Sequence, residues 1–216
     1  MMGRPSALVA GPALLILLIN LKRDRSEIYR NIFLIAEEDL MGLIEKFCRY
    51  IDMLNTWVGH IVAWATAIVV AVVFIDVIMR YAFNISFVFI QELEWHLFAF
   101  IFLMGAGYTL LKDGHVRVDI IYQRCSPKTQ AWINLIGVIV FLIPGCYMVI
   151  ATSLNFVYNA WAVMEGSPDP GGIPYRFILK SFIPAGFVLI LLQGLSLCGR
   201  SLLIILGKEI ETGGEH

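Results

Sequence analysis

Charged residues are scarce in this 216-residue chain: Asp, Glu, Lys and Arg make up 15% of it, and the formal net charge is −1. Soluble globular domains carry about 25% charged residues. A net charge near zero also removes the basic field by which proteins attract nucleic acid. Both shortages argue against a soluble protein and against one that binds nucleic acid.

Cysteine is also rare and follows no functional pattern. The four residues are Cys48, Cys125, Cys146 and Cys198, and no two of them form a Cys-x-x-Cys pair or a zinc spacing. Cys146 and Cys198 lie within apolar runs, where a thiol packs as a small hydrophobic group. The sequence therefore predicts structural thiols, no metal site and no cofactor.

Apolar residues, in contrast, are abundant: 59% of the chain is hydrophobic and the mean hydropathy is +0.78. A hydrocarbon core about 30 Å thick requires about 20 apolar residues in a helix that rises about 1.5 Å per residue. Four stretches meet or approach this length, at residues 57–75, 95–111, 131–164 and 181–199. We therefore expect an all-α integral membrane protein with four transmembrane helices.

The third stretch is too long for one upright span. It is uncharged from residue 131 to 164 and would measure roughly 51 Å as one straight helix. Pro144 and Gly145 lie in its middle, and proline kinks a helix because it removes a backbone hydrogen bond and clashes with the preceding turn. In the fourth stretch, Pro184 is expected in the first turns, where a missing donor does little harm.

Lysine and arginine near the span ends predict the orientation, because they stay preferentially on the cytoplasmic side. The loop between spans one and two holds Arg80 alone, and the last loop holds Arg176 and Lys180. The other flanking segments are richer in these residues: Lys46, Arg49, Lys112, Arg117, Arg124, Lys128, Arg200 and Lys208. We expect a multi-pass protein of a bacterial inner membrane with both termini in the cytoplasm.

Residues 41–57 predict a helix of a different kind, which is amphipathic. Charged side chains occupy one face, while apolar ones recur at helical spacing on the other: Leu43, Ile44, Phe47, Tyr50, Ile51 and Leu54. The charged face consists of Glu45, Lys46, Arg49 and Asp52. Such a helix lies in the membrane interface. The alternative is a solvated turn that leads into the first span.

The first forty residues leave three interpretations open. An apolar run at residues 7–21 precedes a basic cluster, is short for a span and lacks a clear cleavage site. In the first interpretation the start codon is assigned too early and Met41 is the natural first residue. In the second the segment is a fifth span, and in the third it is a cleaved signal peptide. We divide the chain into this extension (1–40), a four-helix domain (41–210) and a polar tail (211–216).

Two sets of polar residues stand where spans one and two meet. Asp76 and Arg80 are four residues apart at the end of span one, so they share a helix face and can pair. This pair is either a local helix-end bridge or a contact that positions a partner subunit. An acid within the hydrocarbon core costs about 2.5 to 3.5 kcal/mol on insertion scales, and pairing offsets part of that cost.

Span two presents one face with a polar end and small residues further along, formed by Glu92, His96, Ala99, Leu103 and Ala106. Close packing and buried polar bonds drive helix association in lipid, so this face is expected to meet protein. An intramembrane acid can also carry protons or cations, which would suit a self-contained proton-coupled exporter. The place of Glu92 at the mouth of the span disfavours that alternative.

Histidine offers a third alternative, a haem-binding anchor of a respiratory enzyme with His60 and His96 as ligands. The expected topology places these two histidines in opposite leaflets, which argues against it.

After span two, His115, Arg117 and Asp119 alternate with valines behind an Asp-Gly turn. Their pattern is not that of a catalytic triad or a metal site, and it is typical of a solvated loop.

Two runs of residues carry a resemblance to a known family. DVIMRYAFNISF at 76–87 and QELEWHLFAFIFLMGAGYTLLKDGHVRVD at 91–119 resemble the small membrane subunit (DctQ-like) of tripartite ATP-independent periplasmic (TRAP) transporters. That family has Asp-Val-x-x-Arg-Tyr-x-Phe-Asn at the end of the first span and an acidic Glu-Leu at the start of the second. A Gly-Ala pair and His-x-Arg-Val-Asp follow. One departure is Gln91, which stands where many members have a first glutamate.

The resemblance implies a small accessory subunit and not an enzyme. In that family a periplasmic binding protein delivers an organic acid to a large permease, which takes it up with sodium, and the small subunit supports the permease. We therefore expect the large permease, the periplasmic binding protein and membrane lipid as partners. The expected partner interface comprises Asp76, Arg80, Tyr81, Asn84, Glu92, His96, Ala99 and Ala106.

Overall fold

The computed structural model describes residues 10–112, 122 and 124–207, with side chains from Glu38 onwards. The chain divides into two compact units, residues 1–44 and 45–216. The predicted interface residues lie in the second unit. The motif His115, Arg117 and Asp119 falls outside the described residues.

Helices make up the regular structure of the described residues, which confirms the predicted all-α class. The first two helices are α1 (Ala10–Ala82), which crosses the boundary between the units, and α2 (Val88–Leu111). They are followed by α4 (Pro127–Gly137), a π-helical turn η1 (Val138–Leu142), α5 (Ile143–Ala162) and α6 (Phe177–Ile205). Four helical stretches are long and apolar enough to cross a membrane: Glu38–Ala82, Val88–Leu111, Pro127–Ala162 and Phe177–Ile205.

The helices extend beyond the apolar runs that predict them. The second begins at Val88, seven residues before the predicted start at residue 95, so that Glu92 and Glu94 belong to the helix. The fourth begins at Phe177, and Pro184 therefore lies inside it, not in its first turn as expected. That prediction is wrong because hydropathy delimits only the uncharged part of a helix. The helix itself continues through charged residues that have partners.

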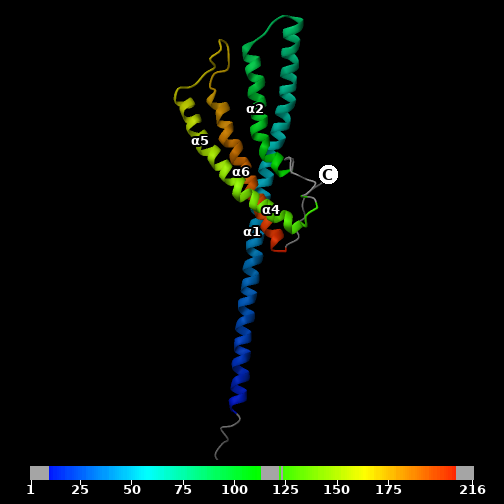
Figure 1. Cartoon of the computed structure of the whole chain (residues 1–216), viewed down its shortest axis with the longest axis vertical. Helices are drawn as coiled ribbons and strands as arrows, with labels where there is room; N and C mark the ends of the chain where they lie inside the picture. Colours follow the sequence, from blue (N-terminus) through cyan, green and yellow to red (C-terminus); the bar gives the residue numbers. More distant parts are fainter. Residues whose placement is uncertain (1–9, 113–121, 123, 208–216) are drawn as a thin grey trace, which may run out of the picture. The chain divides into compact units, whose positions relative to one another are not determined.

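The third span is interrupted where proline predicts it. Pro144 has no amide hydrogen to donate to the carbonyl four residues earlier, and the π-helical turn Val138–Leu142 directly precedes it. A π turn and a proline are both established causes of a change in helix direction. In Figure 1, α4 and α5 run in different directions on either side of this point.

Helix α6 is the centre of the second unit, since α2, α4 and α5 all pack on it (Figure 1). The closest approaches occur at glycines. A Cβ atom added to Gly186 would lie 2.5 Å from the backbone oxygen of Leu103 on α2, and one added to Gly59 would lie 2.5 Å from the ring of Tyr108. Small residues allow such approach between membrane helices, where packing supplies the association energy.

The segment at residues 45–57 is helical as predicted but continues into the first span within α1. Its inward face is formed by Cys48, Ile51 and Asn55, while the large apolar side chains of Phe47 and Tyr50 are exposed. Asp52, predicted on the solvated face, instead forms an ion pair with Arg200 of α6. That assignment is wrong, because a partner on another helix satisfies the carboxylate. The location of this segment at the membrane surface stays a prediction.

Candidate partner-binding corner and its internal supports

The α1–α2 corner, residues 76–96, begins with a reversal of the chain after α1. Asn84 has a φ of 57°, in the left-handed region that asparagine tolerates better than most residues. The amide of Ile85 donates to the carbonyl of Met79 at 3.0 Å, which closes the turn. Phe87 is extended and precedes the first residue of α2. The corner therefore brings the end of α1 and the start of α2 together.

Asp76 and Arg80 form the ion pair that their spacing predicts, with 2.5 Å between Arg80 Nη2 and Asp76 Oδ2. Asp76 is 3% exposed, whereas the Arg80 side chain is 46% exposed. Glu94 of α2 is close enough to interact electrostatically with both. Asp76 Oδ1 and Glu94 Oε1 are buried and accept no hydrogen bond from the described residues. The pair therefore buries its carboxylate and presents its guanidinium group outward.

Glu92 holds the loop at residues 165–174. Ser167 Oγ donates to Glu92 Oε1, and the amide of Ile173 donates to Oε2 at 2.5 Å. The ring Nδ1 of His96 lies 2.6 Å from the Glu92 backbone oxygen. Both carboxylate oxygens are thus bonded within the chain. The sequence shows only that a buried acid needs donors; it does not identify a loop 75 residues away as their source.

Glu92→Ala is expected to release this loop. Charge-assisted hydrogen bonds contribute about 1.5 to 3 kcal/mol each, so exchange of the Ile173 amide hydrogen should accelerate by roughly tenfold or more. Hydrogen–deuterium exchange measured by mass spectrometry on peptides covering residues 165–174 reports it. Gln91→Ala is the matched control, because among the described residues the Gln91 side chain donates to Ser86, which is exposed, at 2.7 Å. Equal exchange in both variants would contradict the role of Glu92.

The other predicted interface residues divide into outward and inward sets. Tyr81 is 80% exposed and Asn84 is also exposed. Ala99 and Ala106 are half-buried on α2, and their neighbour Leu103 on the same face lies against Gly186. The small-residue face of span two therefore meets α6 of the same chain, which leaves Arg80, Tyr81 and Asn84 as the outward part of the corner.

The two histidines proposed as haem ligands lie at different depths. His60 follows Gly59, which packs against Tyr108, while His96 is near the opposite end of α2. Twelve residues separate positions 96 and 108, a rise of roughly 18 Å. Each ring Nδ1 contacts a carbonyl one turn earlier, that of Thr56 or Glu92. This geometry does not suit one haem held between the two rings.

A polar clamp joins α1 and α6 towards the other end of the unit, and the sequence analysis missed it. Its members are Asp52, Asn55, Gln193, Ser196 and Arg200. Asp52 Oδ1 accepts from Gln193 Nε2 at 2.9 Å and from Ser196 Oγ at 3.1 Å, and Asp52 Oδ2 pairs with Arg200. Asn55 Nδ2 donates to Gln193 Oε1 at 2.9 Å. The available signal was the spacing of Gln193, Ser196 and Arg200, which places three polar residues on one face of an apolar helix.

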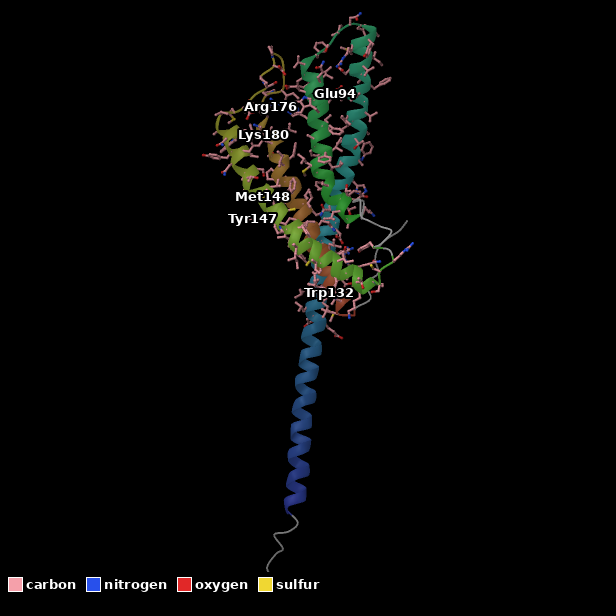
Figure 2. The ribbon with its side chains drawn as sticks, in the orientation of Figure 1. Glu94, Trp132, Tyr147, Met148, Arg176 and Lys180 are labelled. Carbon is pink, nitrogen blue, oxygen red and sulfur yellow. The ribbon has the colours of Figure 1, made fainter. Side chains whose placement is uncertain are left out.

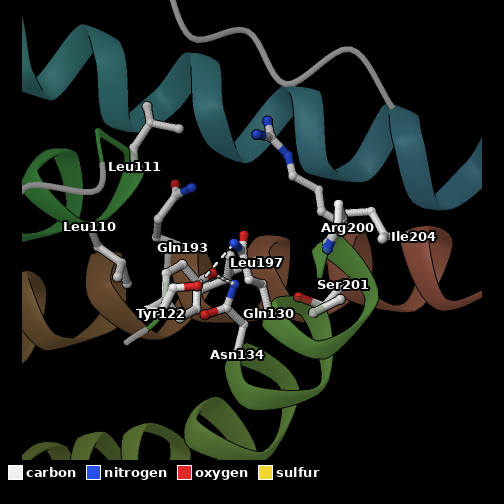
Figure 3. A pocket seen from close by; sticks show the side chains of 12 residues that line it. Leu110, Leu111, Tyr122, Gln130, Asn134, Gln193, Leu197, Arg200, Ser201 and Ile204 are labelled. Atoms are coloured by element: carbon white, nitrogen blue, oxygen red, sulfur yellow. Dashed lines mark hydrogen bonds between the residues drawn. The ribbon is translucent and has the colours of Figure 1, made fainter. Parts of the chain in front are cut away.

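A cavity of about 380 Å³ lies beside this clamp, between α4 and α6. Gln193 and Arg200 contribute to its lining (Figure 3). On its other side Gln130 donates to the backbone oxygen of Tyr122 at 3.1 Å, and Asn134 donates to the Tyr122 hydroxyl at 2.8 Å. Gln130, Asn134, Gln193 and Arg200 thus all bond other groups of the protein, which indicates a structural role for this lining.

Comparison with known proteins adds two findings. The family model described as "Tripartite ATP-independent periplasmic transporters, DctQ component" matches residues 69–202. A protein of Haemophilus influenzae assigned as a TRAP transporter small permease protein is 29% identical over 112 residues, which cover 50% of this chain and 68% of that relative. The matched region contains the α1–α2 corner, the loop at 165–174 and the α6 half of the polar clamp.

Proposed function

The chain belongs to the DctQ family of small components of TRAP transporters, and we propose from this that it supports a large permease in sodium-coupled uptake of an organic acid. A periplasmic binding protein delivers the acid. The chain lies in the inner membrane with both termini in the cytoplasm. In this supporting role the chain itself carries no substrate.

Three acids support this role, because each has a partner within the chain. Asp52 pairs with Arg200, Asp76 pairs with Arg80, and Glu92 binds Ser167 and Ile173. A carrier acid must exchange its partner with a proton or cation during each cycle. Carboxylates that tie together helices and loops cannot do so without loosening the structure. These contacts favour a static support over a self-contained exporter.

The outward face of α1 is the proposed contact for the large permease. Ala63, Ala67 and Ala71 are exposed and recur every four residues, which permits close approach of another membrane helix. Tyr81 lies further along this side of α1, close to Arg80. Aromatic and arginine side chains are enriched among the residues that dominate binding energy. The interface thus runs from the alanines to the outward part of the corner.

Tyr81→Ala and Ala67→Phe are expected to weaken co-purification with the large permease about fivefold or more, since residues central to an interface cost over about 1 kcal/mol when altered. Ile68→Phe is the control, because Ile68 is exposed at the same depth but points about 100° away around the helix. The measurement is the ratio of the two subunits after affinity purification, together with uptake in cells. An undiminished complex with full uptake in both variants would remove this face from the interface.

A further inference from the structure

A second cavity, of about 270 Å³, lies against α6 between α2 and α5. We call it the α2–α6 groove. Trp95, Ala99 and Leu103 of α2 form one wall, and Phe156 of α5 forms the other. Its floor is the first part of α6, where Arg176 and Lys180 lie beside Leu179 and Ile183. Both α2 and α5 pack on α6 (Figure 1), and residues of all three helices line the groove.

The α2 wall of the groove is apolar over roughly 12 Å, the rise from Trp95 to Leu103. Ala99 stands in the middle of this wall, so a large side chain is missing where the neighbouring positions carry Trp95 and Leu103. Polar side chains are confined to one end, where α6 begins. A narrow apolar slot with one polar end matches the shape and chemistry of an acyl chain below its headgroup.

Two cations mark the polar end, as Figure 2 shows at the end of the unit that carries Glu94. The guanidinium carbon of Arg176 lies 5.2 Å from the centre of the Trp95 ring. Lys180 Nζ lies 4.1 Å from the centre of the Phe156 ring and 2.5 Å from Glu165 Oε2. Arg176 forms no ion pair within 4.0 Å with any described residue. Arg176 interacts electrostatically with Glu92, but its guanidinium donors form no ion pair within that distance with the described residues and face an anion at the mouth of the groove.

The depth of these cations suits a phosphate of the bilayer. Helix α6 has 29 residues and is roughly 44 Å long, which exceeds the hydrocarbon core of about 30 Å. Its first turn therefore reaches the headgroup region, where tryptophan and arginine are favoured. Arg176 precedes that turn and Lys180 follows one turn later on the same face.

We propose that the α2–α6 groove binds a membrane phospholipid, with its phosphate at Arg176 and Lys180 and the upper part of one acyl chain against Ala99, Leu103 and Ile183. Arg176 lies over the Trp95 ring and Lys180 over the Phe156 ring, and both line the groove, so both cations can donate charge-assisted hydrogen bonds to a phosphate at its mouth. Glu165 remains beside Lys180 and keeps the site from carrying a large net charge. This inference does not rest on the proposed transport function.

A lipid suits this groove better than a helix of a partner subunit. A helix is about 10 Å across and needs a broad face, whereas this groove holds about 270 Å³ and has its two cations at one end. Arginine and lysine side chains form charge-assisted hydrogen bonds with phosphate groups, such as that of a lipid headgroup. The groove therefore retains a lipid in contact with α2, α5 and α6, while the large permease occupies the outward face of α1.

Native mass spectrometry of the full chain, titrated with palmitoyl-oleoyl phosphatidylglycerol, tests the proposal. Arg176→Gln is expected to weaken the tightest lipid-binding event roughly fivefold, because one cation at the headgroup level is removed. Ala99→Phe fills the slot and should weaken it at least as much with both cations intact. Lys128→Gln and Ala151→Phe are the matched controls, since both positions are exposed on α4 and α5.

Inorganic phosphate at millimolar concentration is expected not to compete, because it lacks the acyl chain that occupies the slot. Two results would overturn the proposal. In the first, Arg176→Gln and Ala99→Phe bind the lipid as tightly as the two controls do. In the second, they keep the lipid but lose the large permease, which would make the groove a protein interface. Circular dichroism and the melting temperature establish that each variant is folded. If one of the two variants does not fold, the other alone decides the outcome.

Discussion

Asp52→Ala is expected to lower the stability of the helical unit by roughly 2 kcal/mol, or about 4 to 8 °C in melting temperature. The substitution removes the acceptor for Gln193, Ser196 and Arg200 and leaves the guanidinium group without its charge partner. Breaking a fully buried ion pair costs about 3 to 5 kcal/mol. The side chains of Asp52 and Arg200 are 16% and 35% exposed, so solvent reduces that cost.

Two further variants separate charge from hydrogen bonding in this clamp. Asp52→Asn keeps an oxygen that accepts from Gln193 or Ser196 but removes the charge, so an intermediate loss is expected. Arg49→Ala alters a charged residue one turn earlier on the exposed side of α1 and should leave the melting temperature unchanged. The measurement is thermal unfolding in detergent followed by tryptophan fluorescence. A melting temperature of Asp52→Ala equal to that of Arg49→Ala would show that the clamp contributes no stability.

Gly186→Ala is expected to disrupt the contact between α2 and α6 and to cost about 1 to 3 kcal/mol, the usual range for overpacking a well-packed core. The added methyl group would lie 2.5 Å from the backbone oxygen of Leu103. A backbone atom within a helix cannot turn aside as a flexible side chain can. The two helices must therefore separate, which would also loosen the Glu92 contact and widen the α2–α6 groove.

Gly145→Ala provides the control with the opposite expected sign. Gly145 also lies within a helix, α5, but an added Cβ there meets no atom within 4 Å. Because alanine is favoured over glycine in a helix by about 1 kcal/mol, this variant should be neutral or more stable. The same unfolding assay compares the two. Equal destabilisation of both variants would mean that close approach to Leu103 is not the cause.

Several features could be predicted from the sequence because they depend on residues close together in it. Long apolar runs predict helices that cross a membrane, since a helix is the structure that bonds its own backbone in lipid. The four-residue spacing of Asp76 and Arg80 predicts their ion pair, and Pro144 predicts the interruption of the third span. The motifs at 76–87 and 91–119 indicate the family, and the match over residues 69–202 shows it.

Other features could not be predicted because their partners are distant in sequence. Glu92 lies 75 residues from Ser167 and 81 from Ile173, and Asp52 lies 148 residues from Arg200. Periodicity shows which residues share a face of one helix, but it does not show which helix that face meets. The sequence therefore shows that Asp52 and Ala99 each lie on a distinct face of their helix, but it does not show which helix packs against that face.

The sequence by itself determined that the chain is an all-α membrane protein of four spans and that it resembles a TRAP small subunit. Only the tertiary structure decided which polar residues support the fold and which remain outward, at Arg80, Tyr81 and Asn84. The physical reason is the solvent. In water, apolar residues mark the inside of a protein, but lipid is as apolar as the core, so hydropathy does not distinguish the packed face of a membrane helix from its exposed face.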